Sequence, residues 1–383
     1  MRKICFVTGT RAEYGLLSRL MRLVKDDKGL QLQVIATNMH LMAEYGETYK
    51  EIEKDGFAID KKVYMHKPSD DAHGIIASMA EEMQGMNDAM SDLKPDILVV
   101  LGDRYEILVA AQVALIHRIP IAHIHGGELT EGAFDDAIRH SVTKMSSLHF
   151  TSCEEYRHRV IQLGEQPSRV FNVGSLGVEN INSIPLMTRE ELEESLDFKI
   201  EAQTILVTYH PVTLGDDPAK DIHEFLDALE DFKDLRVIFT MPNSDTGRDA
   251  IALAVENYVQ KHQGQAKAFT SLGLRRYLST LRFVKAAVGN SSSGIIEVPS
   301  FGIPTLNIGD RQKGRLTSKS VVNCEPSKKD VVAGLKCCLS EDMQKSAKIY
   351  KNPYAKPNTA NLIYQQLKNV ELAGLNLKTF YDL

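Results

Sequence analysis

The chain lacks the features that would direct it to a membrane or to a nucleic acid. No apolar run approaches the roughly 20 residues that a bilayer-spanning helix needs. Positive charge is not in excess, because 45 Lys and Arg stand against 51 Asp and Glu and leave a formal net charge of −6. No signal-peptide pattern precedes the first expected strand. We therefore expect neither a membrane nor a nucleic acid as partner, and an anionic ligand must be bound by local donors.

Cysteine is also scarce. The five cysteines are odd in number and do not have the spacing of a metal site. They are Cys5, Cys153, Cys324, Cys337 and Cys338. This usage indicates a reduced, cytoplasmic protein without a disulfide framework.

The composition itself is ordinary. Apolar residues make up 43% and charged residues 25% of the 383 positions, as in soluble globular proteins. A chain of this length is expected to form two domains.

Short apolar runs alternate with helical patterns along most of the chain. The expected strands of the first part are Ile4–Thr8, Leu32–Thr37, Ile97–Leu101, Ile119–Ile124, Leu148–Thr151 and Val170–Val173. The helical patterns between them are Ala12–Lys25, Ala72–Leu93, Ile107–His117, Asp136–Met145 and Glu154–Leu163. The expected strands of the second part are Thr204–Thr208, Val237–Met241, Lys267–Phe269, Ala286–Val288, Thr305–Ile308 and Val321–Asn323. Strands that are apolar throughout predict parallel sheets covered by helices on both faces.

The alternation is interrupted once. Segment Gly174–Thr188 has no periodicity and is expected to be a linker, and Ala360–Phe380 again has a helical pattern. The predicted fold class is α/β, with two doubly wound, Rossmann-like domains that face a cleft at the carboxyl ends of their strands. The expected bounds are residues 1–175 for the N-terminal domain, 189–357 for the C-terminal domain, and 358–383 for a C-terminal helix packed on the N-terminal domain.

The most informative motif is Asn290–Glu297, which lies between an apolar strand pattern and a short helical pattern. Backbone N–H groups and the hydroxyls of Ser291 and Ser292 at a helix start can hold phosphate oxygens. Glu297, one turn later, can accept two hydrogen bonds from a ribose. These features together indicate a nucleotide ligand. A serine N-cap followed by a solvated Glu is the alternative.

Basic and polar residues follow several other strands. Thr8–Arg11 could hold a phosphate through N–H groups and the Arg11 guanidinium, although it lacks the further glycines of a dinucleotide fingerprint. His210 and Asn243 follow strands of the second part and could contact a phosphate or a sugar. Arg311 is expected to be a second anion ligand, whereas the nearby Lys313 and Arg315 are expected to be solvated.

Acidic residues follow two strands of the first part. Asp103, with Arg104 beside it, suits either a catalytic or ligand-binding group or a helix N-cap.

His125 follows the next strand and shares a face with His123 if strand alternation continues. Glu128 and Asp135 lie just downstream. Proton transfer by Asp103 together with these residues is the favoured interpretation, and metal binding or a structural role stays open.

Seven motifs, taken together, resemble a known family. They are Thr8–Glu13, Gly102–Glu106, His123–Glu128, Asp135–Ser141, Asn243–Gly247, Gly289–Gly294 and Gly309–Arg315. In order and in spacing, over about residues 2–355, they resemble the hydrolysing UDP-N-acetylglucosamine 2-epimerases, and most closely the bacterial enzymes of sialic acid synthesis.

The resemblance implies a fold of the GT-B type and a reaction. UDP-N-acetylglucosamine and water would give N-acetylmannosamine and UDP, by elimination of UDP and rehydration of the glycal. A relative in legionaminic acid synthesis, which acts on a UDP-2,4-diacetamido-2,4,6-trideoxyhexose, has the same motifs and is the first alternative. A GT-B glycosyltransferase or a nucleotide-sugar binding protein is the alternative of another class. The implied partner is a small-molecule nucleotide sugar, no cofactor or metal is implied, and a homodimer or homotetramer is expected.

The resemblance also assigns residues. The implied catalytic residues are Asp103, His125, Glu128 and Asp135. The implied ligands of the UDP and the sugar are Arg11, Arg104, Gly174, His210, Asn243, Ser291, Ser292, Gly294, Glu297 and Arg311. One position departs from the pattern, because several relatives carry Glu where this chain has His125. The role of that Glu then passes to His125 or Glu128, or is not essential.

Overall fold

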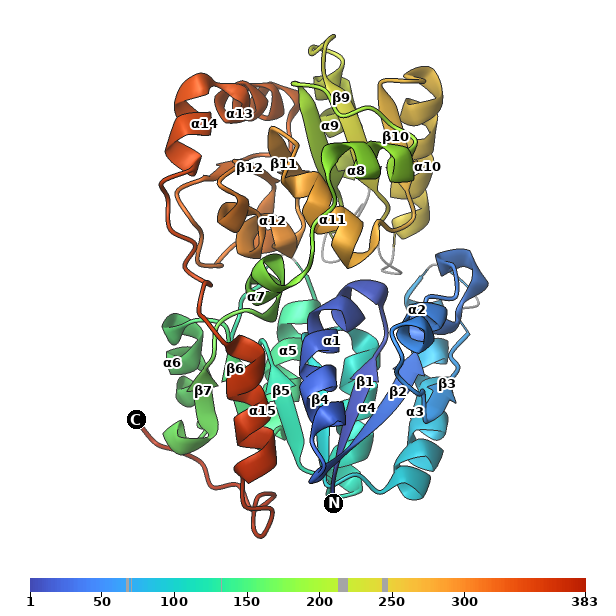
Figure 1. Cartoon of the computed structure of the whole chain (residues 1–383), viewed down its shortest axis with the longest axis vertical. Helices are drawn as coiled ribbons and strands as arrows, with labels where there is room; N and C mark the ends of the chain where they lie inside the picture. The colour runs from blue at the N-terminus through green and yellow to red at the C-terminus, as the bar shows by residue number, and fades with distance from the viewer. Residues whose placement is uncertain (67–68, 70, 132, 213–219, 243–246) are drawn as a thin grey trace. The chain divides into compact units, whose positions relative to one another are not determined.

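The chain divides into two compact units, each with its own parallel sheet (Figure 1). The computed structural model describes residues 1–66, 69, 71–131, 133–212, 220–242 and 247–383. The first unit comprises Met1–Glu128, Asp135–Asn180 and Tyr354–Leu383. The second unit comprises Leu129–Phe134 and Ile181–Pro353.

Among the described residues, the sheet of the first unit has seven strands in the order β3-β2-β1-β4-β5-β6-β7. The strands are β1 (Arg2–Thr8), β2 (Leu30–Thr37), β3 (Lys61–Val63), β4 (Ile97–Leu101), β5 (Ile121–Ile124), β6 (Leu148–Thr151) and β7 (Val170–Asn172). Strands β4 and β5 are buried at every residue, which explains their uninterrupted apolar sequence. Since β1 pairs with both β2 and β4, the strand order reverses there, and the carboxyl ends of β1 and β4 form a topological switch point.

Helices cover both faces of this sheet. They are α1 (Arg11–Asp26), α2 (Tyr49–Lys54), α3 (Ala72–Leu93), α4 (Tyr105–Ile116), α5 (Asp135–Met145), α6 (Glu154–Gln162), α7 (Leu176–Ser183) and α15 (Thr359–Asn369), with 3-10 turns at Asn38–Leu41, Ala43–Tyr45 and Pro167–Arg169. One apolar cluster joins α1 and α15 to one face through side chains such as Leu17 and Ile363. Another joins α3 and α4 to the opposite face through Met86 and Val109.

The second unit repeats this construction. Among its described residues the sheet has six parallel strands in the order β10-β9-β8-β11-β12-β13. They are β8 (Thr204–Thr208), β9 (Arg236–Thr240), β10 (Ala266–Phe269), β11 (Ala286–Gly289), β12 (Thr305–Ile308) and β13 (Val321–Cys324). The helices are α8 (Arg189–Leu196), α9 (Lys220–Leu229), α10 (Arg248–Lys261), α11 (Gly273–Leu281), α12 (Ser292–Ile296), α13 (Lys328–Leu339) and α14 (Glu341–Ala347), with 3-10 turns at Val298–Phe301 and Asp310–Gln312. The prediction of two α/β domains with parallel sheets is confirmed.

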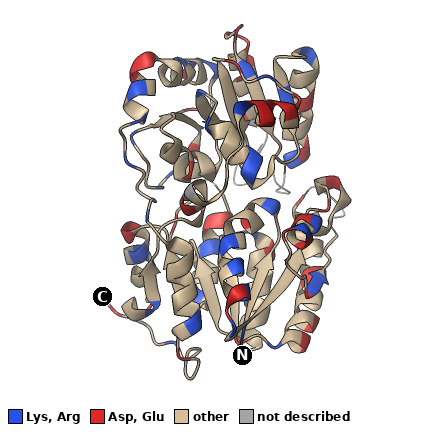
Figure 2. Ribbon diagram, in the orientation of Figure 1, with Lys and Arg blue, Asp and Glu red and all other residues tan. Residues whose placement is uncertain are grey.

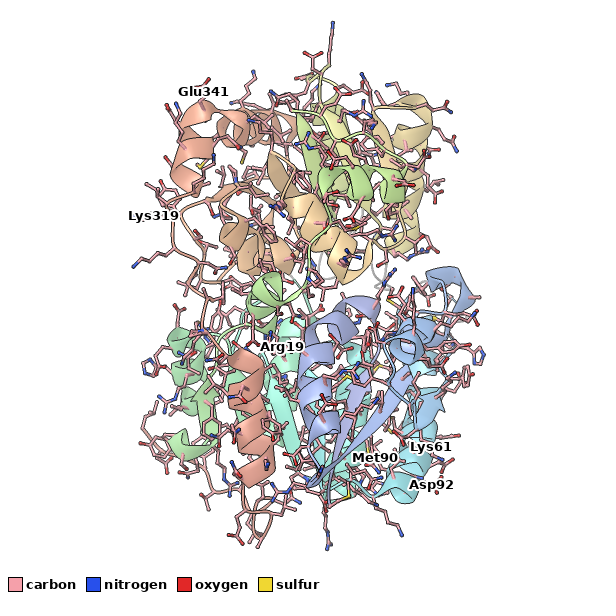
Figure 3. The ribbon with its side chains drawn as sticks, in the orientation of Figure 1. Arg19, Lys61, Met90, Asp92, Lys319 and Glu341 are labelled. Atoms are coloured by element: carbon pink, nitrogen blue, oxygen red, sulfur yellow. The ribbon has the colours of Figure 1, made fainter. Side chains whose placement is uncertain are left out.

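Three local predictions were wrong. Strand β3 was missed because it is a short edge strand that begins with two lysines, and Lys61 pairs with Asp92 on α3 (Figure 3). The expected linker Gly174–Thr188 contains helix α7, whose residues Leu176 and Val178 are buried. The expected C-terminal helix ends at Asn369 and does not continue to Phe380.

Helix α15 joins the end of the chain to its beginning, and it lies alongside α1 in Figure 1. The Arg2 side chain donates to the oxygens of Leu367 and Lys368 at 2.6 Å each, near the last turn of α15. At the other end, the Glu179 carboxylate accepts from Ala360 N at 2.7 Å. A cation at the helix C-terminus and an anion at its N-terminus both complement the helix dipole, so α15 is an integral part of the first unit.

Charged residues of both signs are interspersed along the ribbons of both units in Figure 2. Within the described ranges, no helix has the length and the apolar composition needed to cross a membrane.

A buried histidine fixes the turn after β4. His123 on β5 is fully buried, and its Nε2 lies 2.8 Å from the Gly102 oxygen while its Nδ1 lies 3.1 Å from Thr143 Oγ1 on α5. Burial lowers the pKa of His123 to about 3. A neutral ring then donates from Nε2 to Gly102 and accepts at Nδ1 from Thr143. Gly102 has φ +81°, so this contact holds a backbone turn that suits glycine immediately before Asp103.

We predict that His123 makes stability depend on pH. Because its pKa in the folded state is lower than the value of about 6.5 in an unfolded chain, its contribution is complete above that pH and is lost as the pH falls. Between pH 6.5 and 4.5, the difference in unfolding free energy between the natural protein and a His123→Gln variant should shrink by up to about 1.4 kcal/mol per pH unit. Urea unfolding at several pH values measures this difference. Parallel stability curves for the two proteins would contradict the prediction.

Candidate active site

The first-unit candidates gather around one buried guanidinium. Arg139, on α5, is 1% exposed and forms an ion pair with Asp103, which follows β4. Its Nη1 donates to the Glu128 backbone oxygen at 2.9 Å and lies 3.6 Å from Asp136 Oδ1. A buried cation needs such partners because an unpaired interior charge is strongly destabilising. Asp135, four residues before Arg139, begins α5 and is 7% exposed. The carboxylate-bearing ends of β4, β5 and α5 are therefore linked through Arg139.

His125 and Glu128 lie together, although not for the reason that the sequence suggested. Strand β5 ends at Ile124, and His125 has φ +67°, so the strand alternation that would place His123 and His125 on one face does not extend to His125. His125 Nδ1 lies 3.6 Å from Glu128 Oε1. Ser152, just after β6, donates to the same carboxylate oxygen at 2.8 Å. These contacts leave an imidazole and a carboxylate adjacent, as proton transfer requires.

The turn after β1 is packed on a second acidic residue. Arg104 Nε donates to Glu106 Oε1 at 2.7 Å, and Glu106 is buried and not on the helix surface. A Cβ on Gly9 would lie 2.5 Å from that same oxygen. Gly9 is therefore needed for close approach to Glu106, and its φ is not in the left-handed region. Arg11, the first residue of α1, pairs with Glu51 on α2.

Glu13 also stabilises the turn after β1. Its Oε2 accepts from Gly9 N at 2.7 Å. Burial, aided by the neighbouring Glu106, raises the pKa of Glu13 to about 8, against the lowering effects of the Gly9 hydrogen bond and of Arg104. A neutral Glu13 at pH 7 avoids placing two carboxylate charges beneath one turn.

In the second unit, Asn290 fixes His210. Asn290 follows β11, accepts from His210 N at its Oδ1 at 2.7 Å, and donates from Nδ2 to His210 O at 2.8 Å. This pair of bonds imitates strand pairing between the ends of β8 and β11. Its backbone oxygen accepts in turn from Gln312 Nε2 at 2.8 Å and from Arg311 Nη1 at 3.3 Å. Three strand-end loops of the second unit are thus joined through Asn290.

The loop Ser291–Ser293, called the serine loop below, directly follows Asn290. Ser291 is the N-cap of α12, and its hydroxyl accepts from Ser293 N at 3.4 Å. Tyr277 donates to Ser293 Oγ at 2.6 Å, and burial raises the pKa of Tyr277, so that the phenol remains protonated. Helix α12 has only five residues, so a phosphate bound here would be held by individual N–H and hydroxyl donors and not by a long helix dipole. Ser292 is its first residue, and Glu297 follows its last residue at 9% exposure.

At two positions of the predicted site, the packing of the protein itself requires glycine. Gly174 has φ +85°, and a Cβ there would lie 2.4 Å from Lys356 Cβ. A Cβ on Gly294 would lie 2.8 Å from Thr305 Cγ2, whose hydroxyl also donates to the Gly294 oxygen at 2.7 Å. Ligand contact by either glycine stays a prediction. Asn243 lies outside the described residues.

One expectation for the Gly309–Arg315 loop was wrong. Lys313 is indeed 60% exposed, but Arg315 is partly buried and bonded to other residues. Its Nε donates to Leu129 O at 2.8 Å, and its Nη2 donates to Thr130 Oγ1 at 3.2 Å.

Several contributing residues received no role from the sequence: Arg139, Asn290 and Gln312, which lie within the motifs named above, and Ser152 and Tyr277, which do not. Arg139 could have been noticed as a charge on the helical face that also carries Asp135 and Asp136. Within the described ranges, no group of three or more His, Cys, Asp or Glu side chains is placed to hold a metal ion.

Comparison with known proteins gives full-length relatives. A Campylobacter jejuni protein named GDP/UDP-N,N'-diacetylbacillosamine 2-epimerase (hydrolyzing) is 44% identical over 100% of this chain and 99% of its own. The polysialic acid biosynthesis protein P7 of Escherichia coli is 40% identical over 100% and 98%. A Legionella pneumophila UDP-N,N'-diacetylbacillosamine 2-epimerase (hydrolyzing) is 33% identical over 97% of both chains.

Solved structures share the fold. A Staphylococcus aureus MnaA–UDP co-structure superposes with a TM-score of 0.80 at 16% identity, covering all of both chains. A Neisseria meningitidis UDP-GlcNAc 2-epimerase bound to UDP-GlcNAc gives 0.77 at 16% identity, over 95% of this chain and 99% of its own. The family model described as UDP-N-acetylglucosamine 2-epimerase matches residues 22–368. With parallel-sheet units of the expected GT-B type and relatives of this identity along its whole length, the chain belongs to the UDP-N-acetylglucosamine 2-epimerase family.

Proposed function

We propose that this protein is a hydrolysing 2-epimerase that converts a UDP-activated 2-acetamido sugar and water into the free C2-epimeric sugar and UDP. The observation that carries the proposal is the group of acidic side chains held around Arg139, which a protein that only binds nucleotide sugars does not need. No nicotinamide, flavin or metal takes part in this chemistry.

The reaction pairs proton removal with loss of a stable leaving group. The C2 proton of the sugar is weakly acidic, so a base removes it as the C1–oxygen bond to UDP breaks, and a C1–C2 double bond forms. Water then adds its oxygen at C1, and an acid delivers a proton to C2 on the opposite face. The sum is one water consumed, one UDP released and C2 inverted.

The residues divide by task. Asp103, His125, Glu128 and Asp135 are proposed to move the protons. The residues proposed to bind UDP and the sugar are Arg11, Arg104, Gly174, His210, Asn243, Ser291, Ser292, Gly294, Glu297 and Arg311. Neutralisation of the departing diphosphate by preorganised donors lowers the barrier to elimination.

Two sugars are candidates. UDP-N-acetylglucosamine, which would give N-acetylmannosamine for sialic acid synthesis, is the substrate that the sequence resemblance suggests first. UDP-N,N'-diacetylbacillosamine, a 2,4-diacetamido-trideoxyhexose, is favoured by the names of two of the relatives. We propose the diacetamido sugar as the substrate to test first, with the protein acting in the cytoplasm as a homodimer or homotetramer.

The first test is turnover of each nucleotide sugar without any acceptor, in D₂O. We expect free UDP and a free epimeric sugar that carries one deuterium at C2, with the preferred substrate turned over faster. The rate should be unchanged by a chelator, because arginines, His210 and the serine loop supply the positive charge and the donors. Product that keeps hydrogen at C2 would mean displacement at C1 without elimination, and turnover only with an acceptor would indicate a transferase.

The acid/base assignment predicts a large effect at Asp103. Asp103→Asn should lower turnover by at least about 100-fold, the scale for loss of an acid or base, while UDP binding is retained. Since Asp103 also pairs with Arg139, the matched control is Asp136→Asn, which weakens the other carboxylate contact of Arg139. We expect the control to lose far less. Equal losses in the two variants would assign Asp103 to the support of Arg139 alone.

The nucleotide assignment predicts weaker UDP binding by Glu297→Ala. Loss of charge-assisted hydrogen bonds to the ribose should weaken UDP binding by about 1.5–3 kcal/mol. Calorimetric titration with UDP measures this, and Glu256→Ala on the exposed surface of α10 is the control. Unchanged UDP affinity in a folded Glu297→Ala protein would remove Glu297 from the nucleotide site.

A further inference from the structure

The loop Gly309–Arg315 has two separate sets of contacts in the second unit. Arg311 and Gln312 donate to Asn290, as described above. Arg315, four residues later, instead donates to the Leu129 oxygen and the Thr130 hydroxyl. The proposed nucleotide site uses the first set, and nothing in the proposed function uses the second.

The contacts of the second set, between the end of the loop and residues 129–131, are close. Thr130 is 2% exposed, and its backbone oxygen accepts from Ala133 N at 3.0 Å, which closes a turn. Gly314 has φ +82°, and a Cβ there would lie 2.8 Å from Leu129 Cδ1 and 2.7 Å from Glu131 Oε1. Gly314 and Arg315 therefore both contact residues 129–131. Gly314 does so by close backbone approach, and Arg315 by two hydrogen bonds from its guanidinium.

The segment Leu129–Phe134, which contains these contacts, belongs to a different unit from the residues on either side of it. Leu129–Phe134 is compact with the second unit, whereas the residues that flank it, Glu128 and Asp135, belong to the first unit. Both flanking residues are proposed acid/base groups. The backbone of each is covalently continuous with a segment whose conformation Arg315 holds.

We propose that Arg315 is a positioning residue for the reaction: by fixing the backbone at Leu129 and Thr130, it sets the placement of the Glu128 and Asp135 carboxylates. The inference rests on the proposed function. Arg suits the task because its planar guanidinium can donate from Nε and Nη2 at fixed angles, whereas the Lys ammonium is a single point donor. A misplacement of about 1 Å in an acid/base group is enough to lower a rate by about 100-fold.

The test compares Arg315→Gln, Arg315→Lys and Thr130→Val with Lys313→Ala, a control in the same loop whose side chain is exposed. Arg315→Gln should lower kcat at least 10-fold while UDP affinity and KM stay within about 2-fold, because the described hydrogen bonds of Arg315 go to Leu129 and Thr130 and not to Asn290. Arg315→Lys should restore part of the rate, and Thr130→Val, which removes one of the two acceptors, should have a smaller effect. The control should match the natural protein.

Hydrogen exchange at residues 129–131 supplies a readout that does not need turnover. It should accelerate in Arg315→Gln and not in Lys313→Ala. If the natural protein shows no epimerase activity, the proposed function fails, whereas the exchange result still decides whether Arg315 holds the segment. Unchanged kcat in Arg315→Gln would overturn the inference. A loss of UDP affinity as large as the loss of kcat would also overturn it, because Arg315 would then belong to the nucleotide site.

Discussion

A buried charge governs the arrangement of the first unit. Arg139 places a guanidinium in the interior at the meeting point of β4, β5 and α5, and Asp103, Asp136 and the Glu128 carbonyl compensate it. Since an uncompensated interior charge is strongly destabilising, the fold must keep these groups in place. In the proposed reaction, Asp103 weakens its ion pair with Arg139 whenever it takes up a proton. The same pair therefore favours the prompt return of that proton, which suits a group that must act once in each cycle.

The connection between Glu128 and Asp135 is the second constraint. In a doubly wound sheet, a strand is usually followed by a short loop and then a helix of the same domain. Here residues Leu129–Phe134 of the loop between β5 and α5 belong to the second unit, and Gly314 and Arg315 of that unit contact Leu129. Functional residues are often placed on such loops because a rigid sheet and helix fix the loop ends. The contacts of Gly314 and Arg315 add support in the middle of this loop.

The sequence predicted the sheets well because their strands are apolar on both faces, and this pattern does not depend on distant contacts. It failed for β3, whose lysines suit an exposed edge, and for α7, whose buried face is short. At the candidate site, the sequence identified the motifs, but it could not show which side chains contact one another. His125 lies beside Glu128 with a positive φ that the strand pattern does not predict. Arg315 is partly buried and donates to a carbonyl 186 residues and a hydroxyl 185 residues earlier in the chain.

The net charge of −6 disfavours the approach of an anionic ligand. The overall field would not attract a nucleotide sugar, so its affinity must come from short-range donors. Those donors are held in place by the protein itself. Arg11 pairs with Glu51, the backbone N–H and carbonyl of His210 bond to the Asn290 side chain, and Arg311 donates to the Asn290 backbone oxygen. Since the Arg11 and Arg311 side chains and the His210 backbone are already held in the folded protein, the proposed binding would need little further ordering, and that smaller entropic loss would let a few donors suffice in an acidic protein.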